Sequence, residues 1–154
     1  MGNRLLQLSL LLFFSIGYQY FLSAQCKAPE LGILQGIAAA SPDEKENKIL
    51  SAGFDLRQAT TLRNVTTKIY TKCWMTSANR KDYFEHKLLW NLSDQSVKLA
   101  MLSEEQFQEF RRALDEKHPA GIGSSVVAGK MFTYYLGQED IDGISYYTVM
   151  VVKR

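Results

Sequence analysis

Polar and apolar residues alternate with a period of two over much of residues 54–102, which is the pattern of β-strands. The pattern is strongest in Thr66–Thr76, which is rich in Thr, Ile, Tyr and Trp. It returns after polar turns in Tyr83–Leu92 and Ser96–Leu102, and a weaker candidate lies at Phe54–Ala59. The turns are short, and a parallel return needs a longer crossover, so we expect an antiparallel meander.

The same alternation assigns side chains to faces. Within Thr66–Thr76 it predicts one face with Ile69, Thr71, Cys73 and Met75, opposite Tyr70, Lys72 and Trp74. Within Tyr83–Leu92 it predicts one face with Phe84, His86, Leu88, Trp90 and Leu92. A histidine that alternates with Leu and Trp is typical of the core or edge of a sheet.

Two serine residues stand where helices are expected to begin. Ser41 is followed by Pro42 at the first helical position and by Glu44 at the spacing of a capping box. We expect this helix to run to about Ala52, because Gly53 can adopt the left-handed conformation that ends a helix.

Ser103 begins a second capping box, with Gln106 at its fourth position. The helix that follows has one apolar stripe, formed by Phe107, Phe110 and Leu114. Pro119 disfavours helical geometry at the preceding residue, so the helix should end near Lys117.

The C-terminal part predicts a loop and a hairpin. Residues 119–129 are rich in Gly and Ser, which favours a loop. Two strands, Lys130–Leu136 and Ile144–Lys153, should flank a turn at Gly137–Gly143, and the Asp142-Gly143 pair within it is a hairpin signal.

Residues 26–40 are apolar and rich in Ala and Gly without a clear period, so a short strand or a buried helical turn both fit. The whole pattern predicts the α+β class: an antiparallel β-sheet, made of a meander and a C-terminal hairpin, with two Ser-capped helices packed on one face.

The N-terminus has the layout of a cleaved signal peptide. Arg4 precedes an apolar run to Ile16, and Leu22-Ser23-Ala24 offers small residues before Gln25. We therefore expect a signal peptide at 1–24, a single α+β domain at 25–154, and a secreted or periplasmic protein.

Two other interpretations of this segment are weaker. A membrane anchor needs about 20 predominantly apolar residues, and Gly17 and Gln19 dilute the run. The protein would contact a membrane only if the signal were retained. A bacterial lipoprotein needs a small residue directly before the lipidated cysteine, where Gln25 precedes Cys26.

The charge balance disfavours polyanionic partners. The chain has 18 basic and 16 acidic residues, and loss of Arg4 with the signal leaves 17 against 16. A nearly neutral chain argues against nucleic acid as the main partner. An aromatic content of 12% indicates a packed globule.

Two cysteines, Cys26 and Cys73, remain after the signal. In an oxidising compartment an even number of cysteines favours a disulfide. Because the loop that it would close is long, the chain-entropy model gives a stabilisation of the folded state by about 4 kcal/mol. Two separate buried thiols are the alternative. A catalytic cysteine is disfavoured, because His86 and His118 are the only histidines available as a base.

No catalytic, cofactor-binding or metal-binding motif is complete. Gly129-Lys130 resembles the end of a P-loop, but Ser124 stands where its first glycine belongs and Met131 where Ser or Thr binds magnesium. The histidines and cysteines form no C-x-x-C or H-x-x-x-H pair. Acidic residues on the predicted helix at 104–116 and in the turn at 139–142 leave a carboxylate hydrolase as an unfavoured alternative.

Aromatic residues on the strands offer a possible binding face. Adjacent strand residues point to opposite faces, so one tyrosine of each C-terminal doublet should face outward. The candidates are Tyr70, Trp74, Tyr134, Tyr135, Tyr146 and Tyr147. Cross-strand tyrosine pairs also stabilise sheets without any ligand.

These observations favour an exported, non-catalytic module that binds another protein or an extracellular polymer and needs no cofactor. A secreted inhibitor or effector of a foreign enzyme is the second hypothesis. The sequence resembles no family by its motifs.

Overall fold

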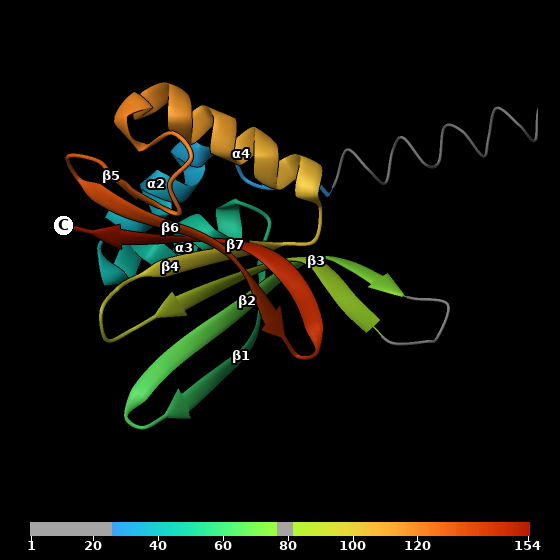
Figure 1. The fold of residues 1–154 in the computed structure, drawn as a ribbon. Helices are drawn as coiled ribbons and strands as arrows, with labels where there is room; N and C mark the ends of the chain where they lie inside the picture. The colour runs from blue at the N-terminus through green and yellow to red at the C-terminus, as the bar shows by residue number, and fades with distance from the viewer. Residues whose placement is uncertain (1–25, 77–81) are drawn as a thin grey trace, which may run out of the picture.

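A seven-stranded antiparallel sheet is the centre of the computed structural model, which describes residues 26–76 and 82–154 (Figure 1). The strand order is β1-β2-β3-β4-β7-β6-β5. The strands are β1 (Asp55–Leu62), β2 (Val65–Thr76), β3 (Asp82–Asn91), β4 (Val97–Met101), β5 (Val126–Ala128), β6 (Phe132–Ile141) and β7 (Ile144–Lys153). The helices are α2 (Leu31–Ala39), α3 (Pro42–Ser51) and α4 (Glu104–Lys117), with a short 3-10 turn η1 (Pro119–Gly121). The predicted α+β class with an antiparallel sheet is confirmed.

The three helices lie on one side of the sheet, and no helix of the described residues lies on its other side (Figure 1). β2 to β4 form the predicted three-stranded meander, and the weak candidate at Phe54–Ala59 becomes β1, which pairs with β2. The chain then passes through α4 to the far edge and returns, so that β7 pairs with β4 in the middle of the sheet. The predicted signal peptide, and most of the turn expected between β2 and β3, lie outside the described residues.

The apolar segment at residues 26–40 contains a complete helix, where a short strand or a single helical turn was expected. Leu31, Leu34, Ile37 and Ala38 of α2 are buried. The helix contacts β4, β7, α3 and α4, and its exposed positions are Gly32, Ile33 and Ala39. Because these exposed positions are apolar or small, no polar residues mark the solvent side, and the helical period is hidden in the sequence.

Only one of the two predicted serine side-chain caps is formed. The Ser103 hydroxyl accepts a hydrogen bond from the Gln106 amide at 3.2 Å. Ser41 occupies the cap position of α3, but its side chain makes no cap hydrogen bond. Its carbonyl instead accepts from the Lys45 amide at 2.9 Å, so Pro42 and the backbone begin this helix.

The C-terminal hairpin is longer, and its turn tighter, than the sequence suggested. β6 and β7 pair up to Ile141 and Ile144, which leaves Asp142 and Gly143 as the two turn residues. Their φ angles of 56° and 75° are those of the hairpin turn that Asp-Gly favours. The predicted loop at 119–129 was also wrong in part, because Val126–Ala128 pairs with β6 as β5.

The main core lies between the helices and the sheet. The helices contribute Leu34, Ile37, Phe107, Phe110 and Leu114, and the central strands contribute Val97, Leu99, Val149 and Val151. On the other side, the hairpin of β6 and β7 curves away from the helices (Figure 1). Lys87 and Thr148 are buried there although no helix covers them. The side of the sheet without helices is called the open face below.

Candidate functional site

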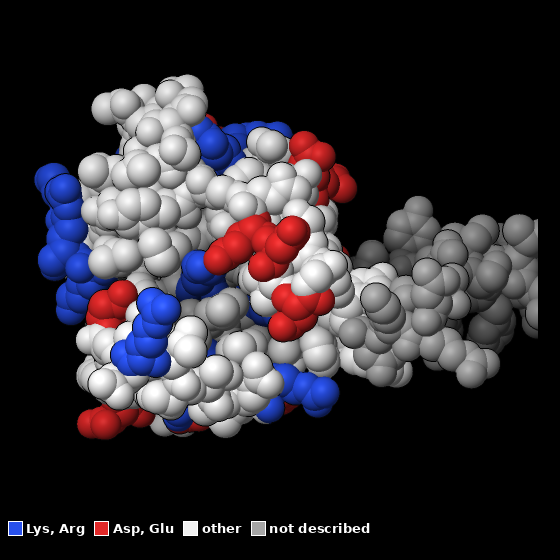
Figure 2. Space-filling view, turned by 60° about the horizontal axis from the view of Figure 1, so that its bottom comes forward, with Lys and Arg blue, Asp and Glu red and all other residues white. Residues whose placement is uncertain are grey.

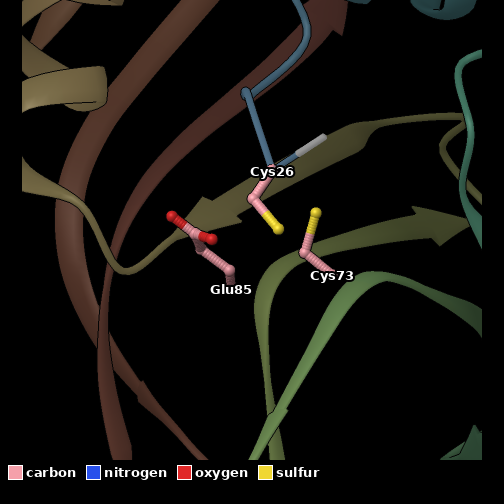
Figure 3. Close-up of side chains that lie close together, drawn as sticks. All are labelled: Cys26, Cys73 and Glu85. Atoms are coloured by element: carbon pink, nitrogen blue, oxygen red, sulfur yellow. The ribbon is translucent and has the colours of Figure 1, made fainter. Parts of the chain in front are cut away.

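Two cysteines and a glutamate that are distant in sequence meet beside the sheet. The ligand atoms of Cys26, Cys73 and Glu85 all lie within 4.8 Å of one another, and each residue is half-buried. Figure 3 shows the two sulfur atoms turned toward each other, with the Glu85 carboxylate beside them. The two sulfurs are close without a disulfide bond between them. These three residues are called the thiol cluster.

An unusual backbone conformation brings Cys73 into this cluster. Its φ of 60° lies in the left-handed region, although the residue stands within strand β2. The register with β3 is the same on both sides, with Lys72 opposite His86 and Trp74 opposite Phe84. The side chain therefore leaves the regular alternation without any change in strand pairing.

The face predicted for Cys73 was wrong for this reason. Alternation grouped it with Ile69 and Thr71, which line the open face. The Cys73 thiol instead meets Cys26, on the side where Lys72 Nζ donates to the Ala52 carbonyl at 3.2 Å. Strained backbone of this kind costs about 1–3 kcal/mol and is concentrated at functional sites.

The side chain of Gln106, in α4, holds the start of the domain against the sheet. Its Oε1 accepts from the Ala28 amide at 2.9 Å and contacts His86 Nε2 at 2.7 Å. Its Nε2 donates to the Cys26 carbonyl at 3.3 Å and to the Glu85 carboxylate at 3.4 Å. One amide thus positions two members of the thiol cluster.

This network assigns the tautomer of His86. An amide oxygen only accepts hydrogen bonds, so His86 Nε2 carries the hydrogen and Nδ1 does not. Nδ1 is buried and has no hydrogen-bond partner among the described residues. His86 is buried, as its alternation with Leu88 and Trp90 predicted, although only one of its two ring nitrogens has a partner among the described residues.

Burial sets the protonation of the cluster. It raises the pKa of the Cys26 thiol, and it raises the pKa of Cys73 to about 12, while nearby Lys72 opposes both changes. Burial lowers the pKa of His86. At neutral pH the thiols are protonated and the histidine is neutral, which disfavours a thiolate nucleophile.

The cluster also has the donors of a soft metal site. Two thiolates and a carboxylate are ligands that Zn²⁺ accepts. Both thiols would have to lose their protons against their raised pKa values before they could bind a metal. A disulfide also forms through a thiolate, with an oxidant that takes up two electrons, but its product carries no charge, whereas a bound metal would require both buried thiols to stay ionised.

We expect a pH dependence from His86. Its pKa is lowered in the folded state, so the unfolded chain binds the extra proton as the pH falls below about 6.5. The free energy of unfolding should be highest above this pH. It should fall below it with a slope of at most about 1.4 kcal/mol per pH unit, the limit for one proton. Urea unfolding of wild type and His86→Gln from pH 7.5 to 5 tests this, and equal slopes would contradict it.

A second feature lies on the open face, where β1, β2, β3 and the β6–β7 turn enclose a hollow of about 480 Å³. Its lining consists of Arg57, Gln58, Ile69, Thr71, Tyr83, Phe84, Lys87, Asp142, Gly143 and Ile144. We call it the open-face hollow. Figure 2 views this side of the molecule, with basic side chains lying beside acidic ones.

The charges of the open-face hollow come from different elements. Lys87 of β3 has a side chain only 7% exposed, and its Nζ lies 2.6 Å from Asp142 Oδ2 in the hairpin turn. The Asp142 side chain is 75% exposed. Lys87 Nζ also lies 5.2 Å from the centre of the Tyr146 ring. A buried cation is thus neutralised by a carboxylate that comes from the surface.

Phe84 corrects the second predicted face. Alternation placed it with His86 and Leu88, but it lines the open-face hollow. Its ring lies under the Arg57 guanidinium, at 5.7 Å between Cζ and the ring centre. Among the described residues, Arg57 has no carboxylate partner within ion-pair distance.

A smaller cavity of about 260 Å³ lies between the start of the domain and α4. Residues 27–32 form one wall, and Gln106, Phe110 and Ala113 belong to the other. Its shape depends on the hydrogen bonds by which Gln106 holds Cys26 and Ala28.

The six aromatic candidates do not share one exposed face. Trp74 is 62% exposed and Tyr135 41% exposed, on strands β2 and β6. Tyr70 is buried, and its hydroxyl donates to Glu46 at 3.2 Å. Tyr134 is also buried, and its hydroxyl accepts from the Gln35 amide group.

The two tyrosine doublets behave differently. Tyr134 points inward and Tyr135 outward, as strand alternation requires. In the second doublet the expectation of an outward ring was wrong. Tyr147 stacks on Phe107 of α4 at 5.2 Å, while Tyr146 is buried on the open face beside Lys87. A binding role remains a prediction for the exposed rings of Trp74 and Tyr135.

No local pattern predicts a site role for the polar residues that organise both sites, Glu85, Gln106, Arg57 and Lys87, and Gln106 was expected only in a helix cap. One signal could have indicated Glu85: a hairpin that pairs Lys72 with His86 necessarily sets it opposite Cys73. The other three are brought in by contacts between elements that share no local pattern.

The chain matches no family model, no curated protein and no solved structure among those compared. None of the helices in the described ranges is both long enough and apolar enough to cross a membrane.

Proposed function

We propose that this chain is an exported, non-catalytic binding module that takes its ligand on the open face of the sheet. The observation that carries the proposal is the open-face hollow, which combines a buried Lys87, the ring of Phe84 and an Arg57 that has no carboxylate partner among the described residues. Binding sites of small ligands are typically concave, largely apolar and equipped with a few fixed polar groups. The proposed partner of the module is a protein or an extracellular polymer. The open-face hollow would bind one chemical group of that partner.

Export is proposed on the signal pattern at residues 1–24. The closeness of Cys26 and Cys73 supports it, because thiols this near are readily joined in an oxidising compartment. We propose that they form a disulfide in the mature protein. That bond would fix the first residues of the domain to β2, next to the hydrogen bonds of Gln106.

Hydrolysis by a pair of carboxylates has little support at this site. Among the described residues that line the open-face hollow, Asp142 is the only acid, and its partner is a lysine. A glycosidase needs two carboxyl groups that flank the same bond. The hollow is therefore better suited to holding a ligand than to cleaving one.

The binding proposal can be tested by NMR on the ¹⁵N-labelled mature protein. Short peptides, oligosaccharides and small organic acids are titrated one class at a time, and each ligand is then recovered for mass analysis. We expect saturable shifts of the amides of Arg57, Lys87 and Asp142, with the ligand unchanged. Shifts confined to the helix layer, or a cleaved ligand, would contradict the proposal.

A further inference from the structure

We infer that the open-face hollow binds a carboxylate group that is attached to an apolar or aromatic body, and that Asp142 occupies the carboxylate position until such a ligand displaces it. The inference rests on the proposed function and specifies the chemistry of its ligand.

The position of Lys87 supports this first. Its side chain is 7% exposed, and it belongs to β3, whose neighbours on both sides hold it in the sheet. A buried ammonium group must keep an anionic or polar partner, since an unpaired buried charge is costly. The hollow therefore requires an anionic or polar group at this point, and a carboxylate fills this place in the structure.

The position of Asp142 shows that this group can be exchanged. It belongs to the two-residue turn at the tip of the β6–β7 hairpin, and its side chain is 75% exposed. Turning the carboxylate away from Lys87 would expose it to water at little cost, whereas Lys87 cannot follow. An external carboxylate can replace it without leaving the lysine unpaired.

The remaining walls indicate what the carboxylate is attached to. Phe84, Ile69 and Ile144 offer apolar surface in the same hollow. The Arg57 guanidinium lies over the Phe84 ring and offers donors in a planar fork, which suits a carboxylate. An anionic head near Lys87 and Arg57 would thus bring an attached ring or aliphatic group against Phe84.

The experiment uses Asp142→Asn, which removes the internal carboxylate and keeps the size of the side chain. The probe is phenylacetate, and phenylacetamide is its uncharged match, both at constant ionic strength. We expect phenylacetate to bind the variant about tenfold more tightly than wild type, because no internal group competes. At a concentration ten times its Kd, it should raise the Tm of the variant by about 5 °C.

Asp140→Asn is the matched control. It removes the same charge from the same hairpin, but Asp140 makes no ion pair among the described residues. Its affinity for phenylacetate should equal that of wild type. Lys87→Met combined with Asp142→Asn should abolish the Tm increase. If Asp142→Asn does not fold, NMR titration of wild type against Lys87→Met measures the same preference for a carboxylate.

The outcomes separate this inference from the proposed function. Equal binding of phenylacetate and phenylacetamide in the hollow would overturn the carboxylate inference and leave a binding module. Stronger binding of glucuronate than of phenylacetate would overturn the inference that the carboxylate is attached to an apolar body, and it would indicate an acidic sugar as the ligand. N-Acetylphenylalanine binding as well as phenylacetate would support the inference and identify a peptide C-terminus as one source of the group. No shift in the hollow with any probe would overturn the inference, and the wider titration of peptides and oligosaccharides then decides the proposed function.

Discussion

Tyr134→Ala should lower the free energy of unfolding by about 3–5 kcal/mol, whereas Tyr135→Ala should change it by about 0.5 kcal/mol or less. Tyr134 is 1% exposed, and its ring lies 5.7 Å from His118 and 6.3 Å from Phe132 between ring centres. Truncation there would leave a cavity that a packed core cannot close. Tyr135 is 41% exposed, so its loss removes little burial.

Urea unfolding of the two variants measures the difference. Tyr134→Phe is the matched control, because it keeps the ring and removes only the hydroxyl that accepts from Gln35. It should cost about 1 kcal/mol, the usual value of one hydrogen bond. Equal losses in Tyr134→Ala and Tyr135→Ala would show that the inward and outward assignments on β6 are wrong.

Loss of the Cys26–Cys73 link should have the second largest effect. If the exported protein carries this disulfide, Cys73→Ala should lower the free energy of unfolding by about 2–4 kcal/mol, because the unfolded chain regains the freedom of a long loop. The substitution keeps a Cβ at a residue whose φ is 60°, so the backbone strain is unchanged. The stability lost therefore reports the covalent link and the packing of one sulfur.

Intact mass and thermal melts test this together. The mass of the exported protein should correspond to a chain that begins at Gln25 and lacks two hydrogen atoms. Cys26→Ala and the double variant should melt like Cys73→Ala, since each removes the same bond. Glu85→Gln keeps both cysteines, so its mass should also lie two hydrogen atoms below that of its own reduced form. Two titratable thiols in the native exported protein would contradict the prediction.

Local sequence patterns determined most of the secondary structure. The period of two in the meander and the apolar stripe of α4 arise because each of these elements has one buried face and one face toward solvent. The stripe consists of Phe107, Phe110 and Leu114. The Ser103 cap and the Asp142-Gly143 turn are equally local, because they are hydrogen bonds and φ angles within a few residues. Such signals survive in the sequence since no distant element can replace them.

The secondary structure of residues 26–40 and of β5 could not be predicted from the local sequence pattern. The solvent-exposed positions of α2 are Gly32, Ile33 and Ala39, so no polar residues mark its period. β5 is three residues long and exists as a strand because β6 lies beside it. Pairing to a neighbour, rather than intrinsic preference, decides a strand of that length.

Both candidate sites were decided by the tertiary structure. The sequence predicted either a disulfide between Cys26 and Cys73 or two separate thiols, but it contained no sign of the left-handed φ that turns Cys73 away from its expected face. Lys87 meets Asp142 only because the hairpin of β6 and β7 curves over the open face. Alternation along a strand follows from local backbone geometry. How whole elements pack decides the curvature of the hairpin, the place of β7 beside β4 in the sheet, and an ion pair between distant residues.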